Sequence, residues 1–160
     1  MNKFMQIKER KHRLPREVYI GRVRCAFSIC VLEKKELFTS NNIFLTIEEM
    51  LLESLKKSIC DAHIYLFMPD HSHVLIEGKS DDSDLWQCVV DFKRKSGYWL
   101  SQNQYSQEWQ KDFYDHILRK DEGLEKQVRY ILWNPVRKGL VDDWKAYPYK
   151  GSTIYDFDQW

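Results

Sequence analysis

The segment at residues 64–77, IYLFMPDHSHVLIE, constrains the fold of this chain more than any other. It contains two apolar runs rich in β-forming residues, and the dipeptide Pro69-Asp70 separates them. This dipeptide is typical of a turn, because proline fixes one backbone angle and aspartate can bond to its own main chain. The segment therefore predicts a strand, a bend and a second strand.

The rest of the chain combines strand and helix patterns around this pair. Residues 19–32 (YIGRVRCAFSICVL) predict a first strand, because β-branched and aromatic residues alternate there in part. Residues 45–63 place apolar side chains at helical spacing, residues 83–100 predict a further helix, and residues 122–133 predict a late helix that Pro135 ends. This order has no regular parallel strand-helix repeat, so we expect an α+β fold in which helices pack on one face of a sheet.

Length and composition predict one globular domain. The chain has 160 residues, of which 43% are hydrophobic and 31% charged, and these are ordinary values for a single domain. We therefore expect one domain over residues 1–160, with a basic arm at 1–18 and a C-terminal extension at 140–160. No apolar run approaches the roughly 18 residues of a spanning helix, and the N-terminal residues lack the apolar core of a signal peptide. We expect a cytoplasmic protein that does not contact membranes.

Charge is segregated along the chain, although the net charge is only +1. Residues 1–24 hold eight Lys or Arg and two Asp or Glu, whereas residues 25–92 hold five and twelve. Residues 93–139 are basic again, with ten Lys or Arg and six Asp or Glu. Such blocks can build a basic face that favours a polyanion as partner, although charge runs are also typical of solvated surfaces.

His71 and His73 lie one residue apart in the second strand of the predicted pair. Because residues i and i+2 of a strand point to the same face, the two imidazoles project together and can share one metal ion. Two histidines do not make a metal site on their own. Taken alone, the pattern also describes two hydrogen-bonded histidines at a strand edge.

Tyr130 and Asn134 lie four residues apart at the end of the late helix, so they share one helix face. A phenol and an amide oxygen on this face could both face one site. Each residue also has an ordinary structural interpretation. A helical tyrosine commonly packs in the core with its hydroxyl at the rim, and an asparagine next to Pro135 is a common helix C-cap.

Four motifs occur in the chain in a fixed order: MPDHSHVLIEG, DFKRKSGYWL, WQKDFYDHILR and RYILWNPVRKGLVDDW. Together they resemble the single-tyrosine HUH transposases, which are insertion-sequence-200-like, and among these the REP-associated tyrosine transposases. The resemblance extends over about residues 19–152, most of the chain. One position departs from the family pattern, because Ser72 stands between the two histidines where a bulky apolar residue is expected. This position faces away from the metal, so the departure weakens packing behind the site and does not threaten coordination.

The resemblance implies a ferredoxin-like fold, the HUH endonuclease fold, in which an antiparallel sheet presents the two histidines. By motif position it implies that His71 and His73 are metal ligands, that Asn134 is the third ligand and that Tyr130 is the nucleophile. Tyr114, in DFYDHILR, is the alternative nucleophile. The implied reaction is cleavage and rejoining of single-stranded DNA next to a hairpin, through a 5′-phosphotyrosine intermediate and a free 3′-hydroxyl. The implied cofactor is a divalent metal, Mg²⁺ or Mn²⁺, because these ions suit phosphoryl transfer and a mixed nitrogen and oxygen ligand set, although imidazole ligands alone suit zinc.

The expected partner is single-stranded or hairpin DNA, and the sequence leaves a homodimer open. The alternative function is a non-catalytic hairpin-binding module on the same fold, but retention of all four proposed site residues favours the enzyme. A hydrolase of small phosphoesters explains the basic segments poorly. The DNA target, and the choice between a self-mobile element and a host-retained function, are not specified by the residues. The candidates for DNA contact supply phosphate-binding charge or stacking rings: Arg22, Arg24, Lys93, Arg94, Lys95, Tyr98, Trp99, Arg119 and Arg137.

Overall fold

The computed structural model describes residues 14–160, so residues 1–13 of the expected basic arm lie outside the described part. Its centre is a five-stranded sheet in the order β4-β1-β3-β2-β5, in which every pair of neighbours is antiparallel. The strands are β1 (Arg24–Cys30), β2 (Cys60–Met68), β3 (His71–Gly78), β4 (Tyr114–Ile117) and β5 (Lys150–Gly151).

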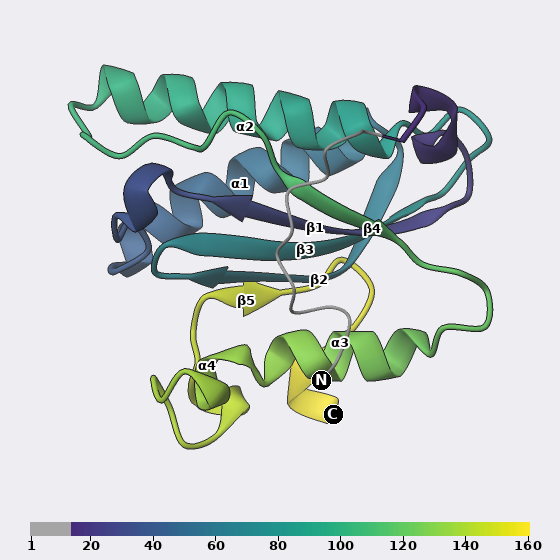
Figure 1. Ribbon diagram of the computed structural model, residues 1–160. Coiled ribbons are helices and arrows are strands. Elements are labelled where there is room, and N and C mark those ends of the chain that lie inside the picture. The colour runs from purple at the N-terminus through teal and green to yellow at the C-terminus, as the bar shows by residue number, and fades with distance from the viewer. Residues whose placement is uncertain (1–13) are drawn as a thin grey trace.

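The two long helices, α1 (Asn41–Lys57) and α2 (Leu85–Gln102), lie side by side on one face of the sheet (Figure 1). The first four strands follow the chain order β1-α1-β2-β3-α2-β4, which is two interleaved strand-helix-strand units. The expected α+β class and ferredoxin-like antiparallel sheet are therefore confirmed. Among the described residues, no helix is both long and apolar enough to cross a membrane.

The predicted pair of strands is the hairpin β2-β3, in which Met68 pairs with His71 across the turn at Pro69 and Asp70. Alternate residues of β3 point to opposite faces of the sheet. Val74 and Ile76 belong to the core beneath α1 and α2, whereas Leu75 belongs to a second core on the other face. The alternation therefore directs His71 and His73 to the face that does not carry the two long helices.

A third helix corrects the expectation that helices cover one face only. α3 (Leu124–Leu132) packs on the opposite face, where Val128 and Leu132 join a buried cluster with Leu66 and Leu75. Figure 1 shows the resulting three layers, with α1 and α2 on one side of the sheet and α3 on the other. The physical reason is that β2 is apolar on both faces, with a run of seven buried residues from Ala62, so both faces need a covering layer.

The late helical segment also differs from expectation at Pro135. Helix α3 ends at Leu132, and after Trp133 the chain enters a second short helix, α4 (Asn134–Arg137), instead of leaving helical conformation. Proline is accepted there because it lies in the first turn of the new helix, where its missing N–H has no partner to lose. The consequence is a bend that places Asn134 at the start of α4, where the residue is only 3% exposed.

The other boundaries shift by a few residues. The first strand begins at Arg24, because residues 16–19 form a 3₁₀ turn whose Tyr19 is buried in the core. Helix α1 begins at Asn41 and ends at Lys57, and the left-handed Ile59 (φ 57°) then turns the chain into β2. Further 3₁₀ turns occur at Leu32–Lys34, Trp144–Ala146 and Phe157–Gln159.

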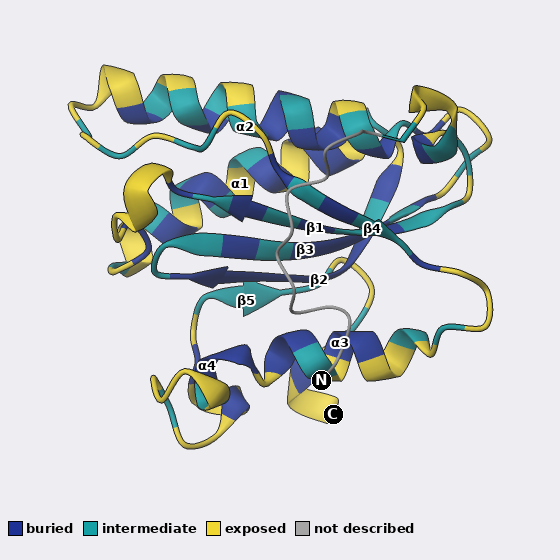
Figure 2. Cartoon of the chain, viewed as in Figure 1, coloured by how far each residue is buried: buried dark blue, intermediate teal, exposed yellow. Residues whose placement is uncertain are grey.

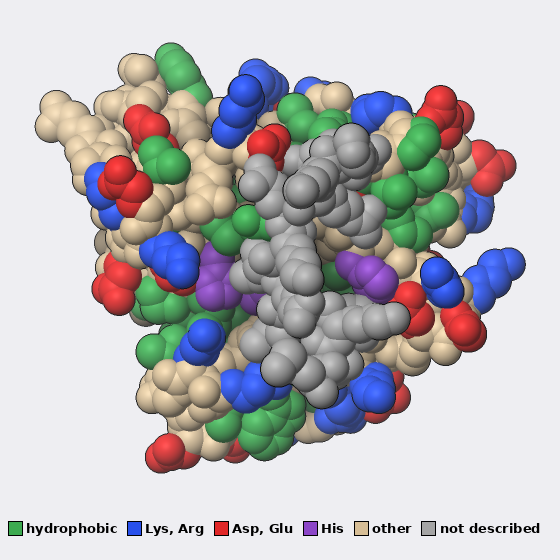
Figure 3. All heavy atoms as spheres, in the orientation of Figure 1, with side chains coloured by type: hydrophobic (Ala, Val, Ile, Leu, Met, Phe, Trp, Pro, Cys, Tyr) green, Lys and Arg blue, Asp and Glu red, His purple; other side chains and the backbone are tan. Residues whose placement is uncertain are grey.

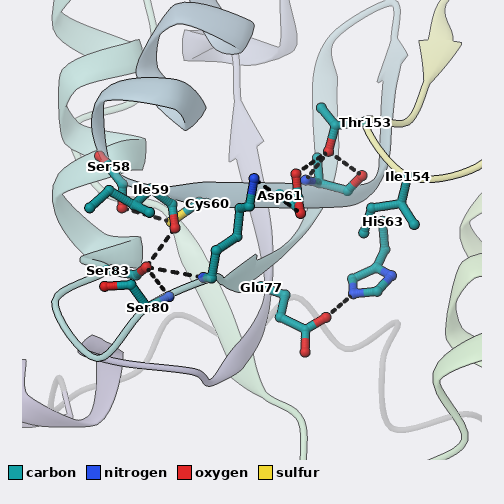
Figure 4. A network of polar contacts seen from close by, with 12 residues as sticks. Ser58, Ile59, Cys60, Asp61, His63, Glu77, Ser80, Ser83, Thr153 and Ile154 are labelled. Carbon is teal, nitrogen blue, oxygen red and sulfur yellow. Dashed lines mark hydrogen bonds and ion pairs between the residues drawn. The ribbon is translucent and has the colours of Figure 1, made fainter.

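The C-terminal extension is packed against the second face of the sheet. Phe157 is buried in the core beneath α3, and the half-buried ring of Tyr155 packs against that core. In Figure 2 the strands are coloured as buried or intermediate, whereas the helices also carry exposed residues. Tyr155 also contacts the buried ring of His63, with its hydroxyl oxygen 2.7 Å from Nδ1, while Nε2 of His63 contacts Glu77. Figure 4 shows the His63–Glu77 contact, together with the hydrogen bonds of Ser83 that connect the turn before α2 to the turn before β2.

Candidate active site

The two histidines of β3 point at a common position. Their Nε2 atoms are 3.1 Å apart, and their rings lie nearly perpendicular, with centroids separated by 4.8 Å. This arrangement follows from the strand, because one intervening residue places both side chains on the same face. The side chain of that intervening residue, Ser72, points to the other face, where its hydroxyl is buried and has no hydrogen-bond partner among the described residues.

Each imidazole is oriented through its other ring nitrogen. The Nδ1 atom of His71 lies 2.6 Å from Oδ1 of Asp70, and Nδ1 of His73 lies 3.0 Å from Oγ of Ser28 on the neighbouring strand β1. Such contacts are typical around metal-binding histidines, because they fix the ring orientation and leave Nε2 available to a ligand.

The electrostatic surroundings keep one of the two rings neutral. Burial, together with the nearby His71 and the positive charge of Arg137, lowers the pKa of His73 to about 3. A neutral imidazole is the form that binds a metal ion. Because Arg137 belongs to α4, its influence also indicates that α4 lies near the histidine pair.

The spacing of the two histidines fits two ligand positions of one divalent ion. Two adjacent ligands of an octahedral ion, at bond lengths of about 2.1 Å, lie about 3 Å apart, and the two Nε2 atoms match this separation. Within residues 14–160, no third His, Cys, Asp or Glu joins them. A complete ligand set therefore needs a donor of another type, and the amide oxygen of Asn134 is such a donor.

Asn134 and Tyr130 are brought together by the junction of α3 and α4. Arg137 donates a hydrogen bond to Oδ1 of Asn134 at 2.8 Å and another to the backbone oxygen of Tyr130 at 2.6 Å. Its guanidinium carbon lies 4.0 Å from the centroid of the Tyr130 ring. The ring itself is half-buried. Tyr130 and Asn134, the two candidates on these helices, thus share Arg137 as a cationic neighbour.

Tyr114, the alternative nucleophile, lies on the same face of the sheet. It pairs with Ser28 on β1, and Ser28 pairs with His73 on β3, so the three residues form one row across the sheet. Paired residues of neighbouring antiparallel strands project to the same side. The fold therefore places both tyrosines on the histidine side, and the choice of Tyr130 as nucleophile stays a prediction.

The basic trio of α2 lies on the opposite face from the histidines. Arg94 and Lys95 bind the buried carboxylate of Asp91, at 2.9 and 3.2 Å. Lys93 donates to two backbone oxygens of the loop before β4. The sheet separates this trio from the histidine pair, and its contact with DNA stays a prediction.

The two aromatic candidates also lie on α2. Tyr98 is 67% exposed, whereas Trp99 stacks on Tyr105 with a centroid separation of 5.3 Å. Two open cavities, of about 500 and 350 Å³, flank Tyr98. Tyr98 is therefore the more accessible of the two for stacking against a base.

The remaining basic candidates are spread over several elements. Arg24 pairs with Glu77 at 3.0 Å, on the histidine side of the sheet. Arg22 is exposed before β1, and Arg119 is exposed in the loop after β4. Arg137 is the member of this group that contacts the candidate site. On the face seen in Figure 3, Lys and Arg side chains lie close to histidine side chains.

Two residues of the site were not identified from the sequence. Asp70 was interpreted only as a turn former, although its position next to His71 is a signal that could have found it. Ser28 has no local signal, because its contact with His73 arises from the pairing of β1 with β3.

Three comparisons place the chain among known proteins. The family described as "Transposase IS200 like" matches residues 22–132, a range that includes both histidines and both candidate tyrosines. A Haemophilus influenzae (strain Rd) protein whose name assigns it to the REP-associated tyrosine transposases is 28% identical over 93 residues. That alignment covers 51% of this chain and 53% of the relative, so the chain spans about half the length of the curated relative that it matches.

Two solved structures have a similar fold. A REP-associated tyrosine transposase bound to a REP hairpin superimposes with a TM-score of 0.73 at 18% identity, covering 89% of this chain and 82% of that one. A Deinococcus radiodurans protein designated a transposase gives a TM-score of 0.51 at 14% identity, covering 79% and 97%. At these identities the likeness concerns the fold. Since the family match itself extends over well over half of the chain, from β1 through α3, this chain belongs to the IS200-like transposase family.

Proposed function

We propose that this protein is a metal-dependent enzyme that cleaves and rejoins single-stranded DNA next to a hairpin, with Tyr130 as nucleophile. The observation that carries the proposal is the convergence of the His71 and His73 Nε2 atoms, 3.1 Å apart, on the sheet face covered by the helices of Tyr130 and Asn134. Membership of a transposase family supports the same assignment.

The proposed reaction replaces one phosphodiester bond by another. The phenolic oxygen of Tyr130 attacks phosphorus, the bond from phosphorus to the 3′-oxygen breaks, and the proton lost by the phenol is balanced by a proton gained at the 3′-oxygen. The products are a 5′-phosphotyrosine and a free 3′-hydroxyl. Because the covalent intermediate retains the phosphodiester energy, rejoining needs no nucleotide cofactor.

The residues around Tyr130 have distinct tasks in this proposal. His71, His73 and Asn134 would hold one divalent ion, Mg²⁺ or Mn²⁺, which supplies positive charge to a phosphate oxygen when bound. Asp70 and Ser28 orient the two imidazoles. The apolar face of α3 fixes the direction from which the nucleophile approaches, because Val128 and Leu132 seat the helix on the sheet.

We propose hairpin DNA as the substrate class. The similar solved transposase is bound to a REP hairpin, and the candidate site here has exposed cationic side chains on its side of the sheet. Arg137, at the end of α4, and Arg119, in the loop between β4 and α3, are candidates for phosphate contact. Tyr98, on the far face, is the candidate for a stacking contact with a more distant part of the strand.

The test is the formation of a covalent protein–DNA adduct. Hairpin oligonucleotides built from repeats that flank the gene are incubated with the protein and Mn²⁺, and the products are separated under denaturing conditions. The wild-type protein and the Tyr114→Phe variant should form the adduct, whereas Tyr130→Phe should bind DNA without forming it. The double variant His71→Ala/His73→Ala should also bind without cleaving.

The outcomes separate the enzyme from the binding module. Hairpin binding by the wild-type protein with no adduct at any tested site would favour the non-catalytic module. A double histidine variant that nicks DNA at the wild-type rate would overturn the metal assignment. An adduct that survives in Tyr130→Phe would overturn the choice of nucleophile.

A further inference from the structure

Arg137 contacts two residues of the candidate site without belonging to its expected ligand set. It is the last residue of α4, and it contacts Asn134, Tyr130 and, through its charge, His73. The other arginine of this helical region, Arg129, instead pairs with Glu125 at 2.9 Å. The arrangement at Arg137 therefore arises from the bend between α3 and α4, which turns this side chain back over the preceding turn.

The contact with Asn134 has a direct consequence for metal binding. The amide oxygen of Asn134 is almost fully buried, with 3% of the residue exposed, and its hydrogen bond comes from a positively charged donor at 2.8 Å. A guanidinium thus contacts the oxygen that the proposed ligand set would use. An amide oxygen has two lone pairs, but two cations that contact the same oxygen lie only a few ångströms apart and repel each other, even though the side chain of Arg137 is exposed.

We propose that Arg137 competes with the divalent ion for Oδ1 of Asn134, and that the guanidinium released by the ion becomes a phosphate-binding group for single-stranded DNA. The proposal rests on the ligand set of the proposed function. A free guanidinium suits phosphate because its planar donors can bind two oxygens at once. Arg137 thereby couples metal binding to DNA binding without being a metal ligand.

The competition predicts an unusual effect of removing a charged side chain. In DNA-free protein, Mn²⁺ affinity is measured from the electron paramagnetic resonance signal of the free ion. Arg137→Gln should bind Mn²⁺ about tenfold more tightly than wild type, since a hydrogen bond from a charged group no longer has to be broken. The matched control Arg129→Gln removes the same charge from α3 and should change the affinity less than about twofold, because Arg129 pairs with Glu125 and not with Asn134.

A double-mutant cycle tests whether the effect passes through Asn134. In an Asn134→Ala background, Arg137→Gln should lose most of its effect on Mn²⁺ affinity, because the contested oxygen is gone. Circular dichroism and thermal melting check that each variant is folded. Unchanged or weaker Mn²⁺ binding by folded Arg137→Gln would overturn the proposal, as would an equal gain in both backgrounds.

The coupling to DNA gives a second, independent measurement. In a Tyr130→Phe background, which prevents covalent chemistry, Mn²⁺ should increase the affinity for hairpin DNA, and Arg137→Gln should remove most of that increase. An increase that persists without Arg137 would contradict the release of the guanidinium. These binding measurements do not depend on cleavage, so the adduct assay can fail or succeed separately.

Discussion

Asp70 provides a test of the metal site that leaves all of its proposed ligands in place. Replacement of Asp70 by asparagine preserves the size of the side chain and an oxygen that can accept from Nδ1 of His71. Asparagine is also accepted in turns, and the backbone bond from Val31 to the Asp70 oxygen needs no side chain. The substitution therefore removes mainly the negative charge beside one imidazole.

The size of the effect follows from the geometry of this contact. The Oδ1–Nδ1 distance is 2.6 Å, and the side chains of Asp70 and His71 are 34% and 17% exposed. Mutation of a residue that supports a metal-binding histidine in this way typically reduces metal affinity 10-fold to 100-fold. Because water partly screens the Asp70 carboxylate, we expect the lower end, about tenfold, which corresponds to about 1.4 kcal/mol.

The assay is the titration of DNA-free protein with Mn²⁺. Ser28→Ala removes a neutral contact to His73 and should have a smaller effect, of about threefold. Asp82→Asn, at an exposed turn before α2, is the charge-matched control and should bind Mn²⁺ like wild type. If Asp70→Asn and wild type bind Mn²⁺ with affinities within twofold of each other, the charge of Asp70 does not support His71 as a metal ligand and the reasoning is refuted.

Three further predictions address stability and DNA contact. Leu75→Ala should lower the free energy of unfolding by about 2–5 kcal/mol in urea melts, because it opens a cavity beneath α3; a loss below about 0.5 kcal/mol would mean that α3 is not seated on this residue. Burial would raise the pKa of Asp91, but hydrogen bonds from its neighbours outweigh it and lower that pKa, so the stability that its charge contributes is present above about pH 4 and is lost as the pH falls. Asp91→Asn should therefore be more harmful at neutral pH than at about pH 3, and equal losses at both would contradict the shift. Replacement of Lys93, Arg94 and Lys95 by glutamine should reduce the salt dependence of DNA binding, whereas an unchanged slope would assign this trio to structural contacts alone.

The sheet and its histidine pair could be predicted because their signals are local. The strand pair around Pro69-Asp70 combines an apolar pattern with a turn former, and the spacing of His71 and His73 specifies a common face whatever lies elsewhere. The helical spacing of residues 45–63 and 83–100 likewise indicates α1 and α2. The exact ends depend on other contacts: Asp84 caps the start of α2, and α1 ends at Lys57, before the turn into β2.

The covering of the second face could not be predicted from local patterns. An apolar strand does not specify which helix will pack on it, so the sequence predicts helices on one face only, whereas α3 covers the other face. The prediction that the chain leaves helical conformation at Pro135 was wrong for a related reason. Proline ends one helix but is also accepted in the first turn of another. The contacts of Ser28 and Arg137 depend on strand pairing and on the bend at Trp133, which only the folded chain reveals.

The measurement that tests the central claim most directly is the identification of the residue bound to DNA. The covalent adduct formed with Mn²⁺ and a hairpin oligonucleotide is digested with protease and nuclease, and the modified peptide is sequenced by mass spectrometry. We predict a nucleotide attached to Tyr130, in a peptide that also contains Ile131 and Leu132 when cleavage occurs after Arg129. A nucleotide attached to Tyr114, in the peptide that ends at Arg119, would contradict the assignment of the nucleophile to the helix beside Asn134.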